Sequence, residues 1–265
     1  MRLKRQEILL VKWTPASNLQ TRGIQVKSRC MQNFEQQQFN LRNARGEPPV
    51  SVLDSASFFG KVMTAFGFAM LLSAAGAYSG FQYFGPIFLA HPGYIWVAYA
   101  LELLLVFTSR IWSTRYPLNY LLFGLFAFSS GLTVVPLLAS VIVQFGGPQI
   151  LMKALMATAF AFTAAAIFGW TTNRSLSGFR GFLLLSLIGM IITSIIGIFL
   201  PWSNSFEMIF SGFGVIVFSG YTMYDFQRLK TYPSDRFIDA ALALYLDMFN
   251  LFLYILRLIS SNQRR

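Results

Sequence analysis

The sequence predicts an all-α integral membrane protein with seven transmembrane helices, and two observations carry this prediction. Of its 265 residues, 55% are hydrophobic and only 12% are charged, whereas about a quarter of the residues in a soluble domain are charged. Seven apolar runs, each long enough to cross a bilayer as a helix, follow a polar first segment. We therefore expect a tail, residues 1–54, and a transmembrane domain, residues 55–262.

The first 50 residues are polar and basic, rich in Gln and Asn, and show no sustained apolar period. This composition predicts a disordered cytoplasmic tail. A start at Met31 would shorten the tail, and we expect residues 1–30 to be an over-extended gene start. A solvated tail is the simpler interpretation, and binding to nucleic acid or lipid is the alternative for its basic residues: Arg2, Lys4, Arg5, Arg22, Lys27 and Arg29.

The apolar runs are separated by short loops that contain polar residues, Gly or Pro. They cover residues 58–80, 87–109, 117–143, 151–170, 181–200, 207–226 and 240–259. Pro136 and Pro148 are expected to kink or end the third run. Cys30 and His91 are the only residues of their types, which excludes an internal disulfide and a metal site rich in Cys or His.

Basic residues gather on one side of the predicted bundle. Nine of the 21 Lys and Arg lie in the first 60 residues, and seven more occupy the loops of the same side: Arg110, Arg115, Arg174, Arg180, Arg228, Lys230 and Arg236. By the positive-inside rule the N-terminus is cytoplasmic and the C-terminus is outside. A bacterial inner membrane is the natural setting, although an organelle membrane fits the same pattern. The formal charge of +11 then reflects topology and contact with the lipid bilayer, and we expect no nucleic-acid partner.

The last run carries polar residues on a single helical face. Ala243, Asp247, Asn250, Tyr254 and Arg257 are spaced by four, three, four and three residues, which places them on one face of an α-helix; we call this face the polar stripe. Intramembrane charges usually face a bundle interior or a water-filled cavity. We therefore expect protein to surround this helix and the polar stripe to serve the function.

Two carboxylates are expected to meet in the cytoplasmic half of the bundle. Asp225 ends the sixth run, Asp247 lies about two turns into the seventh, and the loop between them is short. Two carboxylates held close in a low-dielectric site share a proton and so can report pH; doubly ionised, they offer oxygen ligands to calcium. In the alternative interpretation Asp225 pairs with Arg228, and Arg257 or Tyr254 neutralises Asp247.

Glu102 in the second run is a candidate partner for Arg257, which lies ten residues beyond Asp247. Such a buried ion pair would act as a latch between the second and seventh helices. The alternative is that Arg257 extends to the outer headgroups.

Four segments resemble the Bax inhibitor-1, or transmembrane Bax inhibitor motif, family over residues 55–260. FSGYTMYDFQRLK followed by ALALYLDMFNLFLYILRL is similar to its C-terminal signature, LFAFSSGLTVVP to its third helix and LELLLVF to its second. The resemblance implies six helices around a central C-terminal helix. It also implies a calcium leak gated by pH, in which Asp225 and Asp247 form the sensor and Glu102 pairs with Arg257.

One position departs from the family pattern. Bacterial channels of this type have an arginine near the end of the second helix that bonds to the aspartate pair, and the ungapped equivalent here is Ser113. Arg110 or Arg115 is the candidate substitute, which we call the lock, and Arg110 is favoured because it is three residues from Ser113. Positive-inside anchoring is the alternative role of both.

The leading functional hypothesis is a pH-sensitive calcium leak channel with no cofactor and no enzymatic activity. The chain has no phosphate loop, zinc motif or Ser/His/Asp arrangement, and Asp247 lacks the GxGD context of intramembrane aspartyl proteases. A non-transporting regulator that binds a membrane protease or another membrane protein is the principal alternative. A proton-coupled exchanger is a further one.

Overall fold

The computed structural model describes residues 52–91, 93–145, 147–200 and 202–263. The predicted tail and the proposed start at Met31 lie outside these residues, apart from the first turn of the first helix. All described secondary structure is helical, which confirms the predicted all-α class. The α-helices are α2 (Val52–Ser79), α3 (Gly85–Ala90), α4 (Gly93–Phe107), α5 (Ser109–Trp112), α6 (Leu118–Thr133), α7 (Val135–Phe145), α8 (Gln149–Thr171), α9 (Arg180–Phe199), α10 (Asn204–Arg228) and α11 (Phe237–Gln263).

Four short helical turns connect or extend these α-helices. They are the π-helix η1 (Gly80–Phe84) and the 3₁₀ turns η2 (Ser177–Phe179), η3 (Leu229–Thr231) and η4 (Ser234–Arg236). In the described part of the chain, six helical segments are long and apolar enough to cross a membrane, and α4 is a shorter apolar helix. The chain is therefore a helical membrane protein.

The second predicted run, residues 87–109, is not one continuous helix. The sequence has a proline at position 92, a residue that interrupts helices, and α3 ends just before it. α4 has 15 residues and is therefore about 22 Å long, shorter than the roughly 30 Å hydrocarbon core. α4 ends at Phe107, and the hydroxyl of the next residue, Thr108, donates a hydrogen bond to the carbonyl of Leu104 at 2.6 Å. Such local side-chain bonds favour helix termini and bends.

The third predicted run also divides, and here the sequence identified the cause. α6 ends at Thr133 and α7 begins at Val135. Pro136 lacks the N–H that would bond to the carbonyl of Leu132, so the helix cannot continue unbroken. Pro148 immediately precedes α8. The structure thus confirms the expected interruptions at both prolines.

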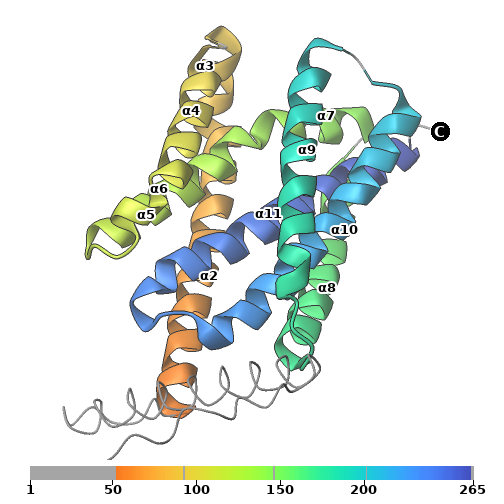
Figure 1. The fold of residues 1–265 in the computed structure, drawn as a ribbon. Helices are drawn as coiled ribbons and strands as arrows, with labels where there is room; N and C mark the ends of the chain where they lie inside the picture. The colour runs from red at the N-terminus through yellow and green to blue at the C-terminus, as the bar shows by residue number, and fades with distance from the viewer. Residues whose placement is uncertain (1–51, 92, 146, 201, 264–265) are drawn as a thin grey trace, which may run out of the picture. The chain divides into compact units, whose positions relative to one another are not determined.

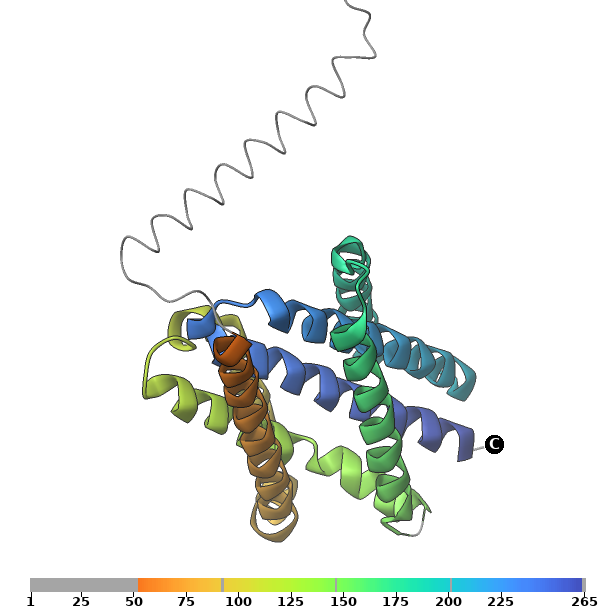
Figure 2. The same cartoon turned by 90° about the horizontal axis from the view of Figure 1, so that it is seen from below.

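α11 packs against helices on more than one side. It contacts α10, α8 and α6, and in both views it lies between α6 and the α8–α10 pair (Figures 1 and 2). Leu244, Leu251 and Leu256 are fully buried, although they lie off the polar stripe. Protein therefore covers several sides of this helix, whereas the arrangement of six helices around it stays a prediction.

Candidate functional site

Asp247 is a buried acid in the middle of the packed last helix. Only 5% of its surface is exposed, and its Oδ2 atom has no hydrogen-bond partner among the described residues. A buried polar atom usually has such a partner, because leaving it unpaired costs about 1–3 kcal/mol. An unpaired carboxylate oxygen at this depth is therefore energetically costly.

Asp225 is the charged neighbour of Asp247. It lies near the end of α10, which packs along α11, and its carboxylate acts electrostatically on that of Asp247. Tyr221, one turn earlier on α10, interacts electrostatically with both acids. The structure thus brings the two predicted sensor residues together at the contact between the last two helices.

Arg228 is the basic residue that acts on this pair from α10. Its positive charge interacts with Asp225, and its guanidinium lies 4.6 Å from the ring centroid of Tyr232. Tyr232 lies between the two apolar segments, and burial raises the pKa of its hydroxyl, opposed by the nearby Arg228 charge. The phenol therefore stays neutral and offers its ring face to the cation.

Neither candidate for the lock reaches the aspartate pair in the structure. Arg110 and Arg115 are exposed, and within the described residues neither forms an ion pair with Asp225 or Asp247. Ser113 is fully buried, and its hydroxyl has no hydrogen-bond partner in the same part of the chain. The position where the family arginine was expected is thus a small, enclosed polar site, and the lock stays a prediction.

Glu102 is held by α6. Its Oε1 accepts a hydrogen bond of 2.7 Å from the hydroxyl of Thr133, and the carbonyl of Thr133 accepts one of 3.1 Å from the hydroxyl of Tyr99. Two residues of α4 therefore bond to Thr133, the last residue of α6: Tyr99 as a donor and Glu102 as an acceptor. Thr133 lies where the third predicted run divides into α6 and α7.

Arg257 occupies a different environment from the one expected. Its guanidinium lies 6.0 Å from the ring centroid of Tyr254, and it borders a cavity together with Asn250 and Glu207. Across the described ranges no ion pair joins Arg257 to Glu102. Tyr99 interacts electrostatically with both Glu102 and Arg257. The latch between the second and seventh helices stays a prediction.

Sequence reasoning missed Tyr245. This side chain is fully buried, and its hydroxyl donates to the Oγ of Ser73 at 3.0 Å and lies 3.4 Å from the carbonyl oxygen of Ala127. Tyr245 lies off the polar stripe, so its position in the helical repeat did not single it out. The sequence does place a hydroxyl-bearing residue, Ser73, in the first apolar run and another, Tyr245, in the last. Hydroxyl groups inside a membrane require hydrogen-bond partners, so these two residues could have been paired on that ground.

Replacing Thr133 by valine is expected to destabilise the protein by about 1–3 kcal/mol, the usual cost of leaving a buried hydrogen-bonding group without its partner. Valine keeps the branched shape and removes the donor to Glu102. Thermal denaturation in detergent measures the loss. The matched control is Thr193→Val, because within the described residues the Thr193 hydroxyl bonds to the carbonyl of Gly189 on the same helix and to no other helix. Equal melting temperatures for the two variants would contradict the role of Thr133.

The carboxylates do not form a cage for a resident ion. Among the described residues, no three His, Cys, Asp or Glu side chains gather where they could hold a metal. Asp225 and Asp247 together supply four carboxylate oxygens, fewer than the six to eight ligands of a tightly held calcium ion.

Comparison with known proteins extends over most of the chain. Residues 55–264 match the family described as "Inhibitor of apoptosis-promoting Bax1". Bax inhibitor 1 of Schizosaccharomyces pombe is 31% identical over 191 residues, which cover 68% of this chain and 70% of the yeast protein.

Two bacterial relatives show similar identity. An uncharacterized protein of Helicobacter pylori (strain J99) is 34% identical over 225 residues, covering 83% of this chain and 94% of the relative. Inner membrane protein YbhL of Escherichia coli (strain K12) is 33% identical over 176 residues, covering 62% of this chain and 72% of the relative. Together with the multi-helix fold and the match to residues 55–264, these similarities show that the chain belongs to the Bax inhibitor-1 family of membrane proteins.

Proposed function

We propose that this protein is a pH-sensitive calcium leak channel, gated by Asp225 and Asp247. The observation that carries the proposal is the buried carboxylate of Asp247, with one oxygen unpaired in the described structure and a second carboxylate, that of Asp225, acting on it. Two acids in this arrangement respond to pH through the charge that they carry jointly.

The direction of gating follows from that joint charge. At acid pH the pair holds a proton, and one carboxyl group can donate a hydrogen bond to the other, which draws α10 and α11 together. At alkaline pH both groups are ionised and repel each other in a low-dielectric site. Repulsion separates the helices and exposes carboxylate oxygens to a hydrated cation. Calcium flux should therefore rise with pH.

A polar cavity supports a path towards the pair from the other end of α11. It has a volume of about 370 Å³ and lies between α9, α10 and α11. Asn250, Tyr254 and Arg257 of the polar stripe border it. The polar stripe therefore runs from this cavity towards Asp247, along one face of a single helix. Glu102 adds a further acid in the bundle on the α4 side.

We further propose seven spans, of which α4 and α5 form the short second one. The first six surround the seventh, α11. The basic loops then face the cytoplasm, the C-terminus lies outside, and the protein resides in a bacterial inner membrane. The name of the Escherichia coli relative, an inner membrane protein, supports that location. Reaction of single introduced cysteines with an impermeant thiol reagent in intact cells tests this orientation.

Calcium flux into liposomes tests the function. Purified protein is reconstituted with a calcium indicator inside, and the initial rate is measured from about pH 5 to 8, the range that spans shared and double ionisation. We expect flux down the calcium gradient that rises with pH and is absent from protein-free liposomes.

Flux that does not change with pH would contradict gating by the pair. No flux at any pH, together with co-purification of a membrane protease, would favour the non-transporting regulator. Uptake driven by a pH gradient would favour an exchanger.

A further inference from the structure

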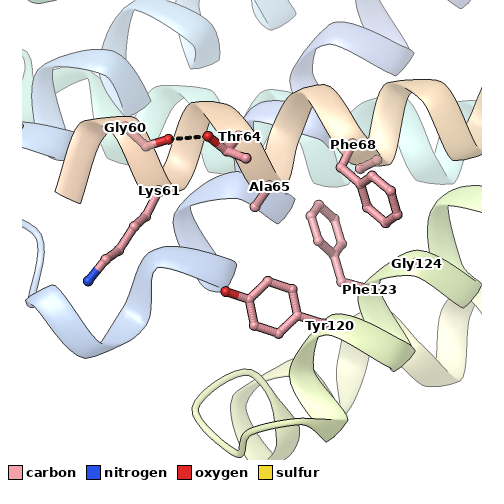
Figure 3. Close-up of a pocket in the computed structure, with 9 residues that line it drawn as sticks. Gly60, Lys61, Thr64, Ala65, Phe68, Tyr120, Phe123 and Gly124 are labelled. Atoms are coloured by element: carbon pink, nitrogen blue, oxygen red, sulfur yellow. Dashed lines mark hydrogen bonds between the residues drawn. The ribbon is translucent and has the colours of Figure 1, made fainter. Parts of the chain in front are cut away.

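A groove between α2 and α6 lies apart from the aspartate site. It has a volume of about 530 Å³, within the usual range for small-molecule sites. Phe68, Ala65 and Ala69 of α2 and Phe123 of α6 form its apolar part. In Figure 3 the ring of Phe68 lies towards one end and the side chain of Lys61 towards the other. The rings of Phe123 and Tyr120 lie between them, with the Tyr120 hydroxyl on the Lys61 side. The groove is thus amphipathic along its length.

The polar end of the groove carries donors that protein groups do not use. Lys61 is exposed, and no carboxylate pairs with it among the described residues. The Tyr120 hydroxyl is likewise without a hydrogen-bond partner in that part of the chain, while its ring lies 5.7 Å from that of Phe237. An ammonium group and a phenol hydroxyl that line the same groove are complementary to a phosphate, which accepts several hydrogen bonds and carries a negative charge.

The polar end lies at headgroup depth. Lys61 is the fifth residue of the first apolar segment, Ser57–Phe84, and is therefore about 6 Å inside its end at 1.5 Å per residue. Tyr120 is the third residue of α6, which follows the loop containing Arg110 and Arg115. A lysine at this depth extends its charge to the interface while its methylene groups contact apolar surface.

We propose that this groove binds one anionic phospholipid, with the phosphate at Lys61 and Tyr120 and one acyl chain along Phe68 and Phe123. The charge at the polar end selects this occupant. An apolar helix from a second copy of the chain would bury the Lys61 charge without a counterion, which is costly. A zwitterionic lipid has no net charge to attract the ammonium group.

Lipid retention measured by native mass spectrometry tests the proposal. The full-length protein is titrated in detergent with phosphatidylglycerol or with phosphatidylcholine of the same chains. We expect one phosphatidylglycerol to bind saturably, and about fivefold more weakly in Lys61→Gln, since one lysine near a membrane surface contributes a factor of this size. Lys153→Gln is the matched control, because Lys153 is an exposed lysine on α8 outside the groove.

A second pair of variants tests whether the bound lipid requires the open space of the groove. Gly60 lines it, and a Cβ there would meet no atom within 4 Å, so Gly60→Leu fills the groove without disturbing the backbone. Gly67 has equally open surroundings but does not line the groove. We expect Gly60→Leu to lose the bound lipid and Gly67→Leu to keep it.

Three results would overturn the proposal: unchanged retention in Lys61→Gln, equal affinity for phosphatidylcholine, or a second protein copy in place of the lipid. None of these measurements depends on calcium flux.

Discussion

Replacing Asp247 by asparagine is expected to hold calcium flux at its low, acid-pH level across the whole pH range. Asparagine has nearly the same shape but cannot ionise, so the repulsion that separates α10 from α11 is lost. A loss of about 1.4 kcal/mol of repulsion already lowers the open population about tenfold. We therefore expect the flux at alkaline pH to fall about tenfold or more, measured as the initial rate in liposomes.

Flux could also be lost because the variant unfolds. The melting temperature of Asp247→Asn distinguishes unfolding from a loss of gating. The substitution removes an ionisable group whose Oδ2 lacks a partner in the described structure, so the melting temperature should not fall. Asp239→Asn is the matched control on the same helix, because Asp239 pairs with Arg236 at 3.6 Å, apart from the aspartate pair. Wild-type pH dependence in Asp247→Asn, or its loss in Asp239→Asn, would refute gating by this pair.

Replacing Gly131 by alanine is expected to destabilise the bundle strongly. A Cβ at this position would collide with the backbone carbonyl oxygen of Ser73, and a Cβ at Gly76 would collide with that of Phe128. The two glycines thus allow the backbones of α2 and α6 to approach closely. Overpacking of this kind typically costs about 1–3 kcal/mol, and contact with backbone atoms leaves little means of relief. Thermal denaturation in detergent measures the loss.

Gly67 of α2 supplies the control for this prediction. A Cβ there would meet no atom within 4 Å, so Gly67→Ala should be neutral or stabilising by up to about 1 kcal/mol through helix propensity. Similar melting temperatures for Gly131→Ala and Gly67→Ala would show that α2 and α6 are not in close contact in the membrane.

The sequence predicted the features that depend on a single segment or on two segments that are adjacent in the chain. Apolar runs gave the helices, Pro136 gave the break between α6 and α7, and the short loop before α11 indicated that α10 and α11 are neighbours. The helical repeat placed Asp247 on one face and so singled it out. These inferences need only the geometry of one helix or of two helices joined by a short loop.

Pairings between distant helices could not be predicted, because they depend on the rotation of each helix about its axis. Glu102 accepts from Thr133, although its charge made Arg257 the obvious candidate. In the same way, Ser113 is enclosed while Arg110 and Arg115 are exposed. The spacing from Ser113 to Arg110 predicted a common helical face. Ser113 is the C-cap of α5 with helical dihedrals, yet its side chain is buried whereas that of Arg110 is exposed.

The hydrogen bond from Tyr245 to Ser73 has a consequence for biosynthesis. The two residues are 172 positions apart, so the ribosome has completed nearly the whole chain before Ser73 can meet this partner. Until then α2 and α6 lie in the membrane without the last helix, with the Ser73 hydroxyl and the Ala127 carbonyl lacking the contact that Tyr245 provides. A chain that stops before Tyr245 therefore lacks the hydroxyl that joins the last helix to Ser73 and Ala127 of its first helices.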